Sequence, residues 1–265
     1  MSELRVLQCG LLVGRCDFAV FYKNWKVWCV AWGLRSITSA AMISLLGKVL
    51  GSEEQVHYLL IGNAVLMGVH AAGWAIQSST WDRMDGTYAL LVVSPSGLRA
   101  PLTGRTAIWI FNGLMTSLTT FAALALLFRL PLPTPHVWFV PIILFVICAS
   151  AYAFALSIGA FVVRIPRARN IIHSFALTTL AAFTGANVPL TFWPSWIQAL
   201  SSGLPTTHGL GALRLLLAQG ATPAIARGLA LELLIGLAWF TFARLSMNAM
   251  ANAGRADGTI DFVGV

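Results

Sequence analysis

The amino-acid sequence predicts an all-α polytopic membrane protein, and three observations support this class. The 265 residues are 58% hydrophobic and only 10% charged, whereas about a quarter of the residues of a soluble domain are charged. The apolar residues form continuous runs of roughly 20 residues, the length of helix that crosses the hydrocarbon core. These runs lack the alternation expected of a membrane barrel. We therefore expect one transmembrane domain over residues 1–265.

The first predicted element is a helix lying in the plane of the membrane interface, within residues 1–24. Apolar side chains such as Leu7 and Leu11 are interspersed with basic ones such as Arg5 and Arg15 at roughly helical spacing. Such a helix turns its basic groups toward lipid phosphates. The alternative is a fraying soluble tail.

Six membrane spans are predicted after this helix, over residues 28–50, 57–78, 106–128, 137–163, 171–190 and 224–244. Basic residues of short loops concentrate on the cytoplasmic side of membrane proteins. With these six spans, the basic residues of one side are Arg5, Arg15, Lys23, Lys26, Arg83, Arg99, Arg105, Arg164, Arg167, Arg169, Arg244 and Arg255. Those of the other side are Lys48, Arg129, Arg214 and Arg227. We therefore expect both termini in the cytoplasm, and we attribute the net charge of +8 to orientation rather than to nucleic-acid binding.

A polar, basic and turn-rich insert, residues 82–105, separates the second and third spans. It predicts a short amphipathic helix over 82–97 with Asp82 or Asp85 in its first turn, where negative charge is favourable. Two interpretations are open. The helix is either a membrane-surface helix or a rigid lever that a cytoplasmic partner pushes.

Residues 191–222, on the other side, are apolar but are interrupted by Pro194, Gly203, Pro205 and Gly209. This pattern predicts two short helices that re-enter the outer leaflet. Non-helical backbone at that depth needs protein or trapped water to satisfy its polar groups.

The sequence carries no recognisable catalytic or nucleotide-binding motif. It lacks the phosphate loop G-x-x-x-x-G-K-[ST], so any ATP that drives the protein must bind another polypeptide. Its five histidines and four cysteines show no metal-ligand or redox spacing. We expect no metal, no cofactor and no catalytic site in this chain.

The insert carries the pattern D-R-x-x-G-T-x-x-x-L-x-x-S-P, followed by G-x-x-x-x-x-x-G-R. This pattern resembles a stretch between the second and third spans of the permeases of type-2 ATP-binding-cassette (ABC) exporters. Later stretches over 187–196, 204–214 and 255–260 are similar to the family's in the same order, so the resemblance covers essentially the whole chain. Met84 and Ala89 stand where family members commonly carry charges, which is consistent with one half of a heteromeric pair.

The resemblance implies a partner assembly. Two permeases, as a homodimer or a heterodimer, would pair in the lipid of a bacterial cytoplasmic membrane, and two ABC ATPase subunits carrying ATP and Mg would dock beneath them and drive substrate outward. The residues that would couple to the ATPase are Asp82, Arg83, Asp85, Gly86, Thr87, Leu91, Ser94 and Pro95.

The sequence favours a hydrophobic or amphiphilic substrate, such as a drug-like natural product, a peptide, a lipid or a lipid-linked glycan, because buried charge is scarce. One rival function is an ion-coupled carrier, which needs several intramembrane ionisable groups. The other is an integral-membrane enzyme, which needs clustered polar residues near one interface.

Five residues are candidates for the substrate pathway or an outer gate, namely Glu232, Pro189, Trp193, Trp196 and Pro205. Glu232 is the one acidic residue deep inside a predicted span, where a lone carboxylate is costly. It is expected to pair with Arg214 or Arg227, to satisfy unwound backbone of 191–222, or to line the pathway, and we favour the ion pair.

Two further assignments stay open at the level of sequence. Arg35 either snorkels to the interface or lines the pathway. The tryptophans, including Trp193 and Trp196, form either interfacial belts or an aromatic drug-binding surface.

Overall fold

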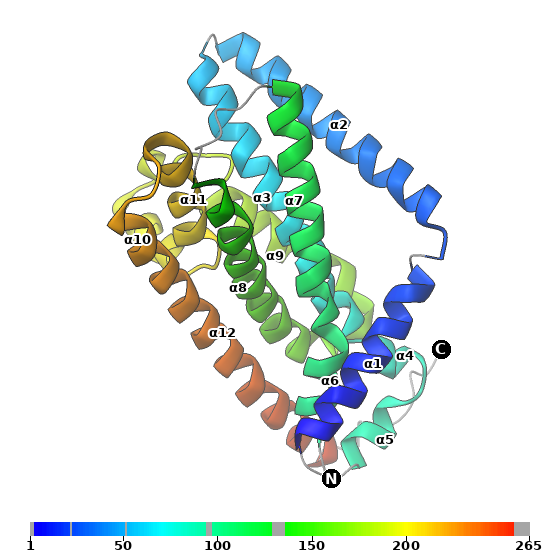
Figure 1. The fold of residues 1–265 in the computed structure, drawn as a ribbon. Helices are drawn as coiled ribbons and strands as arrows, with labels where there is room; N and C mark the ends of the chain where they lie inside the picture. The colour runs from blue at the N-terminus through cyan, green and yellow to red at the C-terminus, as the bar shows by residue number, and fades with distance from the viewer. Residues whose placement is uncertain (1–2, 22, 51, 94–96, 129–135, 257–265) are drawn as a thin grey trace.

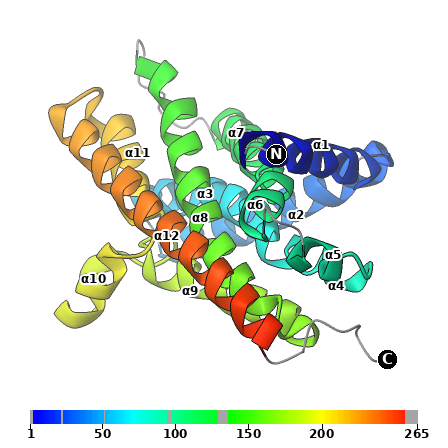
Figure 2. The ribbon, with the colours of Figure 1, turned by 90° about the horizontal axis from the view of Figure 1, so that it is seen from below.

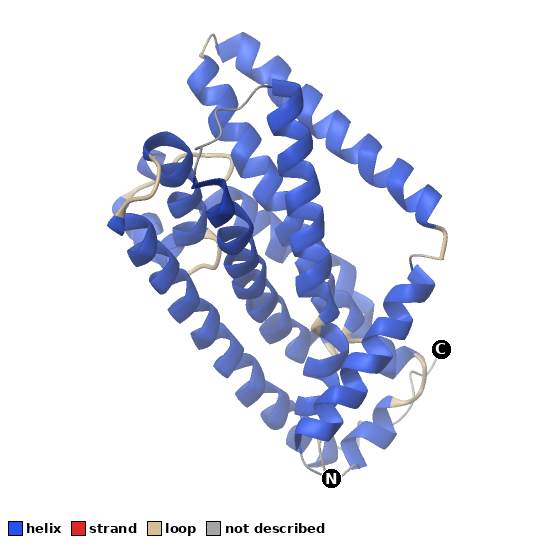
Figure 3. Ribbon diagram, viewed as in Figure 1, coloured by secondary structure: helices blue, strands red, loops and turns tan. Residues whose placement is uncertain are grey.

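The computed structural model describes residues 3–21, 23–50, 52–93, 97–128 and 136–256, which contain helices and no strand (Figure 3). The elements in chain order are α1 (Glu3–Phe21), α2 (Trp25–Leu50), α3 (Glu53–Ser78), α4 (Trp81–Met84), α5 (Tyr88–Val93), α6 (Arg99–Thr106), α7 (Ile108–Phe128), η1 (His136–Trp138), α8 (Phe139–Val162), η2 (Pro166–Ala168), α9 (Arg169–Phe183), η3 (Leu190–Phe192), α10 (Ser195–Ser202), α11 (Thr207–Gln219) and α12 (Pro223–Ala256). The all-helical class predicted from composition is confirmed for these residues.

The core of the bundle is built around α3 and α8, which are the most buried of the long helices (Figure 1). Helix α7 packs on α3, and α12 packs along α8. Helix α2 diverges from the bundle, and a hydrogen bond from the Ser39 hydroxyl to Asn63 Oδ1 at 2.7 Å joins it to α3. The outer faces of α7 and α12 stay apolar and exposed.

Among the described residues, four helices are long and apolar enough to cross a membrane. These are Glu54–Met84, Arg99–Phe128, His136–Val162 and Pro223–Met250. They correspond to the second, third, fourth and sixth predicted spans. The first predicted span matches α2 in position, but α2 is not among the four.

The fifth and sixth predicted spans differ from the structure in their bounds. Helix α9 has 15 residues, or roughly 22 Å, and ends before Gly185, whose φ is +80°. Pro189 disfavours helical backbone at the residue before it. The apolar run that predicted a span to residue 190 therefore continues as non-helical backbone. Helix α12, in contrast, continues to Ala256.

The elements that carry the candidate sites lie at opposite ends of the bundle (Figure 1). One end, called the insert end here, holds α1, α4, α5 and α6, and seen from below α1 lies across α6 (Figure 2). The far end holds α10 and α11, the two short helices expected between residues 191 and 222.

Candidate functional site

The insert folds as two short helices instead of the single helix predicted over 82–97. Helix α4 follows the end of α3, and α5 begins after a break at Gly86, whose φ is +73°. Left-handed backbone of this kind favours glycine. Asp82 lies in the first turn of α4, and Asp85 is the C-cap of that helix, whereas α5 has no acidic residue in its first turn. Ser94 and Pro95 lie outside the described residues.

The turn between α4 and α5 is closed by Asp82 and Thr87. The Thr87 N–H donates to the Asp82 carbonyl at 2.8 Å. The Thr87 hydroxyl lies 3.1 Å from that carbonyl and 3.2 Å from Asp82 Oδ1. Asp82 is buried, so its carboxylate is committed to structure. The predicted coupling residues Asp82, Gly86 and Thr87 thus form one compact turn.

Arg105 on α6 joins this turn to the first helix. Its Nε donates to Asp17 of α1 at 2.7 Å, and its NH1 group donates to Asp82. Its NH2 group lies 3.9 Å from Asp85, and the guanidinium lies over the Trp81 ring at 5.6 Å. The Arg105 side chain is only 11% exposed, so three elements are held by one largely buried cation.

Helix α1 reaches α6 because glycines line their contact. A Cβ on Gly14 would lie 2.2 Å from the Arg105 carbonyl oxygen, and one on Gly104 would lie 2.4 Å from that of Leu7. No other residue fits at such a backbone approach. The predicted interfacial helix therefore docks on protein along one face and leaves apolar residues such as Leu4 and Leu12 exposed.

Arg83 fixes the insert to the end of α8. Its NH1 group donates to the carbonyl of Val163 at 2.8 Å, at the C-cap of α8, and the guanidinium lies 5.7 Å from the centre of the Tyr88 ring. Burial raises the pKa of the Tyr88 phenol, and the nearby charge of Arg83 partly offsets this increase. The phenol is therefore neutral. Tyr88, Val92 and Val163 belong to a small apolar cluster against which Leu91 packs.

The opposite face of the insert is exposed. Leu90 is 73% exposed and Met84 is 53% exposed, and the Asp85 side chain is 62% exposed. The insert therefore has a rigid base and an outward surface made of these three residues, which we call the insert face.

At the far end, Glu232 of α12 is fully buried and caps α11. Its carboxylate accepts hydrogen bonds from the N–H groups of Thr206 at 2.6 Å and Gly209 at 2.9 Å, and from the Ser150 hydroxyl of α8. Thr206 is the N-cap of α11 and has a φ of +77°, the one positive φ of a non-glycine residue in the described ranges. A carboxylate at a helix N-terminus satisfies donors that lack helical partners.

The favoured interpretation of Glu232 as half of an ion pair is wrong. Arg214 donates instead to the carbonyls of Gly185 at 2.8 Å and Tyr58 at 3.1 Å, and no ion pair with Arg227 occurs among the described residues. The geometry matches the second interpretation, that the carboxylate satisfies unwound backbone of the 191–222 segment.

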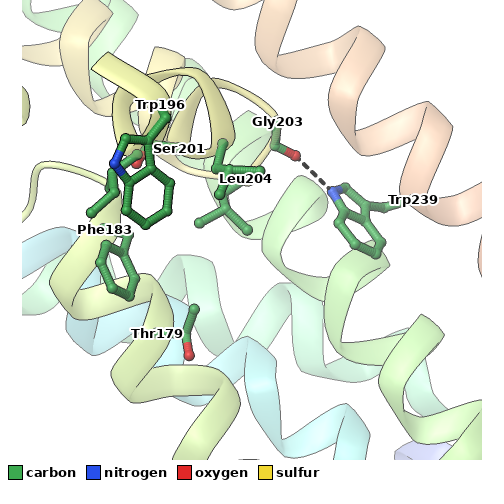
Figure 4. A pocket seen from close by; sticks show the side chains of 9 residues that line it. Thr179, Phe183, Trp196, Ser201, Gly203, Leu204 and Trp239 are labelled. Atoms are coloured by element: carbon green, nitrogen blue, oxygen red, sulfur yellow. Dashed lines mark hydrogen bonds between the residues drawn. The ribbon is translucent and has the colours of Figure 1, made fainter. Parts of the chain in front are cut away.

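The other candidate pathway residues are not brought to one point. Pro205 is buried next to Thr206, whose N–H binds Glu232, whereas Pro189 precedes η3. Trp193 packs on Phe183 at 5.2 Å between ring centroids. Trp196 lines an apolar pocket of about 500 Å³ between α9, α10 and α12 (Figure 4). The side chain of Arg35 lies outside the described residues.

Sequence reasoning missed Arg105, Asp17 and Trp239 as members of these sites. Arg105 closes the G-x-x-x-x-x-x-G-R pattern, which could have marked it, but Asp17 lies 88 residues away and carries no local signal. Within the described ranges, no group of three or more His, Cys, Asp or Glu residues is placed to hold a metal ion.

Comparison with known proteins relates the chain to one family. A family model described as ABC-2 type transporter matches residues 8–217, a range that includes the insert, Arg105 and most of α11. No curated protein matches the chain.

Proposed function

The chain belongs to the ABC-2 type transporter family as a multi-pass membrane permease, and from this premise we propose that it is the transmembrane subunit of an ATP-driven exporter. The family implies an ABC ATPase partner, and the insert face is the surface that we assign to it. The observation that carries the proposal is that one side of the insert is exposed while the other side is anchored to the bundle. Leu90, Met84 and Asp85 are exposed, while Arg83 and Asp82 anchor the base.

In the proposed mechanism, ATP and Mg act on the partner, and this chain receives a mechanical input. A push on the insert face passes through Arg83 to the end of α8 and through Asp82 to Arg105, and from there to α6 and α1. Movement of α8 would reach the far end, because Ser150 of α8 holds the carboxylate of Glu232. The two ends are thus linked by one stiff helix.

We further propose a bacterial cytoplasmic membrane with both termini inside, a second permease as partner, and outward movement of a hydrophobic or amphiphilic substrate. The use of Glu232 as a helix cap leaves little charge for binding a hydrophilic ion. The apolar lining at the far end favours the same substrate class. Exposed apolar residues of α12, such as Leu234 and Leu237, suit contact with lipid or with the second permease.

Reconstitution with an ATPase tests this function. We expect ATP-dependent accumulation of an amphiphilic dye in proteoliposomes only when an ABC ATPase subunit is reconstituted together with this chain. Leu90→Glu is expected to weaken ATPase association about tenfold, since it places a charge at the centre of an apolar contact. Asn252→Glu adds the same charge at another exposed position and serves as control. Sustained uphill transport by the isolated chain would instead establish an ion-coupled carrier.

The turn at Gly86 gives a second test. Gly86→Val forces a β-branched residue into a φ of +73°, which costs about 1–3 kcal/mol and disturbs the link from the insert face to Arg105. Coupled ATP hydrolysis is expected to fall while membrane insertion is retained. Gly211→Val is the matched control, because a Cβ there meets nothing within 4 Å. Equal coupling in both variants would remove the turn from the mechanism.

A further inference from the structure

The pocket at the far end has aromatic walls from three different helices (Figure 4). Phe183 of α9, Trp196 of α10 and Trp239 of α12 line it, and Leu200 and Leu204 add aliphatic surface. The volume of about 500 Å³ falls in the range of sites for drug-sized molecules, which are mostly apolar with few polar groups.

Two polar side chains of the lining already have hydrogen-bond partners. The Trp239 indole N–H donates to the Gly203 carbonyl at 3.0 Å, and the Thr179 hydroxyl donates to the Phe175 carbonyl at 2.9 Å. Ser201 differs. It is fully buried, it lines the pocket, and its hydroxyl has no hydrogen-bond partner among the described residues. Because buried polar groups nearly always have partners, this hydroxyl marks where a polar group of a ligand belongs.

The wall that carries Gly203 and Leu204 is held in place from α12. Trp239 binds the Gly203 carbonyl, and Glu232 binds the Thr206 N–H at 2.6 Å. These two α12 residues lie on one face, about two helical turns apart. The pocket is therefore preformed, which lowers the entropic cost of binding.

We propose that this pocket binds the transported molecule, which has a flat apolar body and one hydrogen-bonding group that meets Ser201. The inference rests on the proposed function and narrows its substrate class. The acyl chain of a bulk lipid would fill the apolar volume, but it offers no group to the Ser201 hydroxyl. The aromatic walls favour a flat ring system, because stacked and edge-to-face ring contacts stabilise such ligands beyond simple burial.

The test uses 1-aminoanthracene, a flat ring system with one amino group, and the permease–ATPase complex in phosphatidylcholine nanodiscs. Binding is followed by the fluorescence of the probe, and the photoreactive 1-azidoanthracene locates the site by mass spectrometry. Ser201→Ala is expected to weaken binding about threefold to tenfold, the effect of one neutral hydrogen bond. Leu204→Trp fills the pocket and is expected to weaken binding at least about tenfold. Leu126→Trp, exposed on α7 outside the pocket, is expected to bind as the parent does.

The outcomes separate this inference from the proposed function. Labelling away from Phe183, Trp196 and Trp239, or unchanged affinity in both pocket variants, would overturn the inference even if ATP-driven export is observed. Quenching of Trp239 by brominated acyl chains that the probe does not relieve would identify the occupant as lipid and would also overturn it. Pocket labelling without any ATP-driven export would leave the binding site standing and overturn the function.

Discussion

Replacing Arg105 by methionine is expected to destabilise the permease by about 3 kcal/mol and to abolish coupled transport. The substitution leaves Asp82 and Asp17 without their cation, and breaking a largely buried pair from one side is strongly unfavourable. The side chains of Arg105, Asp82 and Asp17 are 11%, 13% and 30% exposed, so water compensates poorly. The checks are the thermal unfolding midpoint in detergent and substrate-stimulated ATP hydrolysis in the reconstituted complex.

A second substitution distinguishes the role of Arg105 in charge balance from a loss of packing. Adding Asp82→Asn to Arg105→Met removes the stranded carboxylate, while the Thr87 hydroxyl can still donate to the amide oxygen. The double variant is expected to recover part of the unfolding midpoint but little of the coupling, because the link from α4 to α1 stays broken. Arg227→Met, at an exposed arginine, is the control. An Arg105→Met protein as stable and as coupled as the parent would show that Arg105 does not link α4 to α1.

Substitution of Glu232 is expected to have the next largest effect. Glu232→Ala leaves the N–H groups of Thr206 and Gly209 buried without an acceptor, at a cost of about 1–3 kcal/mol for each unsatisfied group. Glu232→Gln keeps one carbonyl oxygen but turns an NH2 group toward a donor. We therefore expect the unfolding midpoint and the transport rate to decrease in the order Glu, Gln, Ala.

The control for Glu232 is Glu54→Gln, an exposed carboxylate at the start of α3. It is expected to leave stability and transport unchanged. A Glu232→Gln protein that unfolds and transports like the parent would show that the carboxylate charge is dispensable and that the α11 cap needs only one acceptor.

The helical elements could be predicted because each depends on local composition. Continuous apolar runs predicted α3, α7, α8 and α12 within a few residues at most ends. The predictions failed where a helix and its apolar run end at different residues, at the end of α9 and at the end of α12, which continues to Ala256. Past Phe183 the chain stays apolar although Gly185 and Pro189 end the helix, so hydrophobicity alone overran the boundary.

The candidate sites could be predicted only in part. The motif around Asp82, Gly86 and Thr87 identified residues that fold into one turn, since all three lie within a few positions. The motif did not indicate that Gly86 divides the helix, because glycine is also tolerated at helix surfaces at modest cost. It also gave no sign that Asp17, so distant in sequence, completes the Arg105 cluster.

The sequence by itself determined that this is a membrane protein, that it is helical and which family it resembles, since these properties depend on composition and on short ordered patterns. Only the tertiary structure decided the partners of its buried charges. Glu232 was expected to meet an arginine, yet it binds backbone N–H groups 26 and 23 residues away. Every residue except proline carries such a donor, so no residue type in the sequence indicates which backbone N–H binds the carboxylate. The partner is identified only when the fold brings a helix N-terminus next to Glu232.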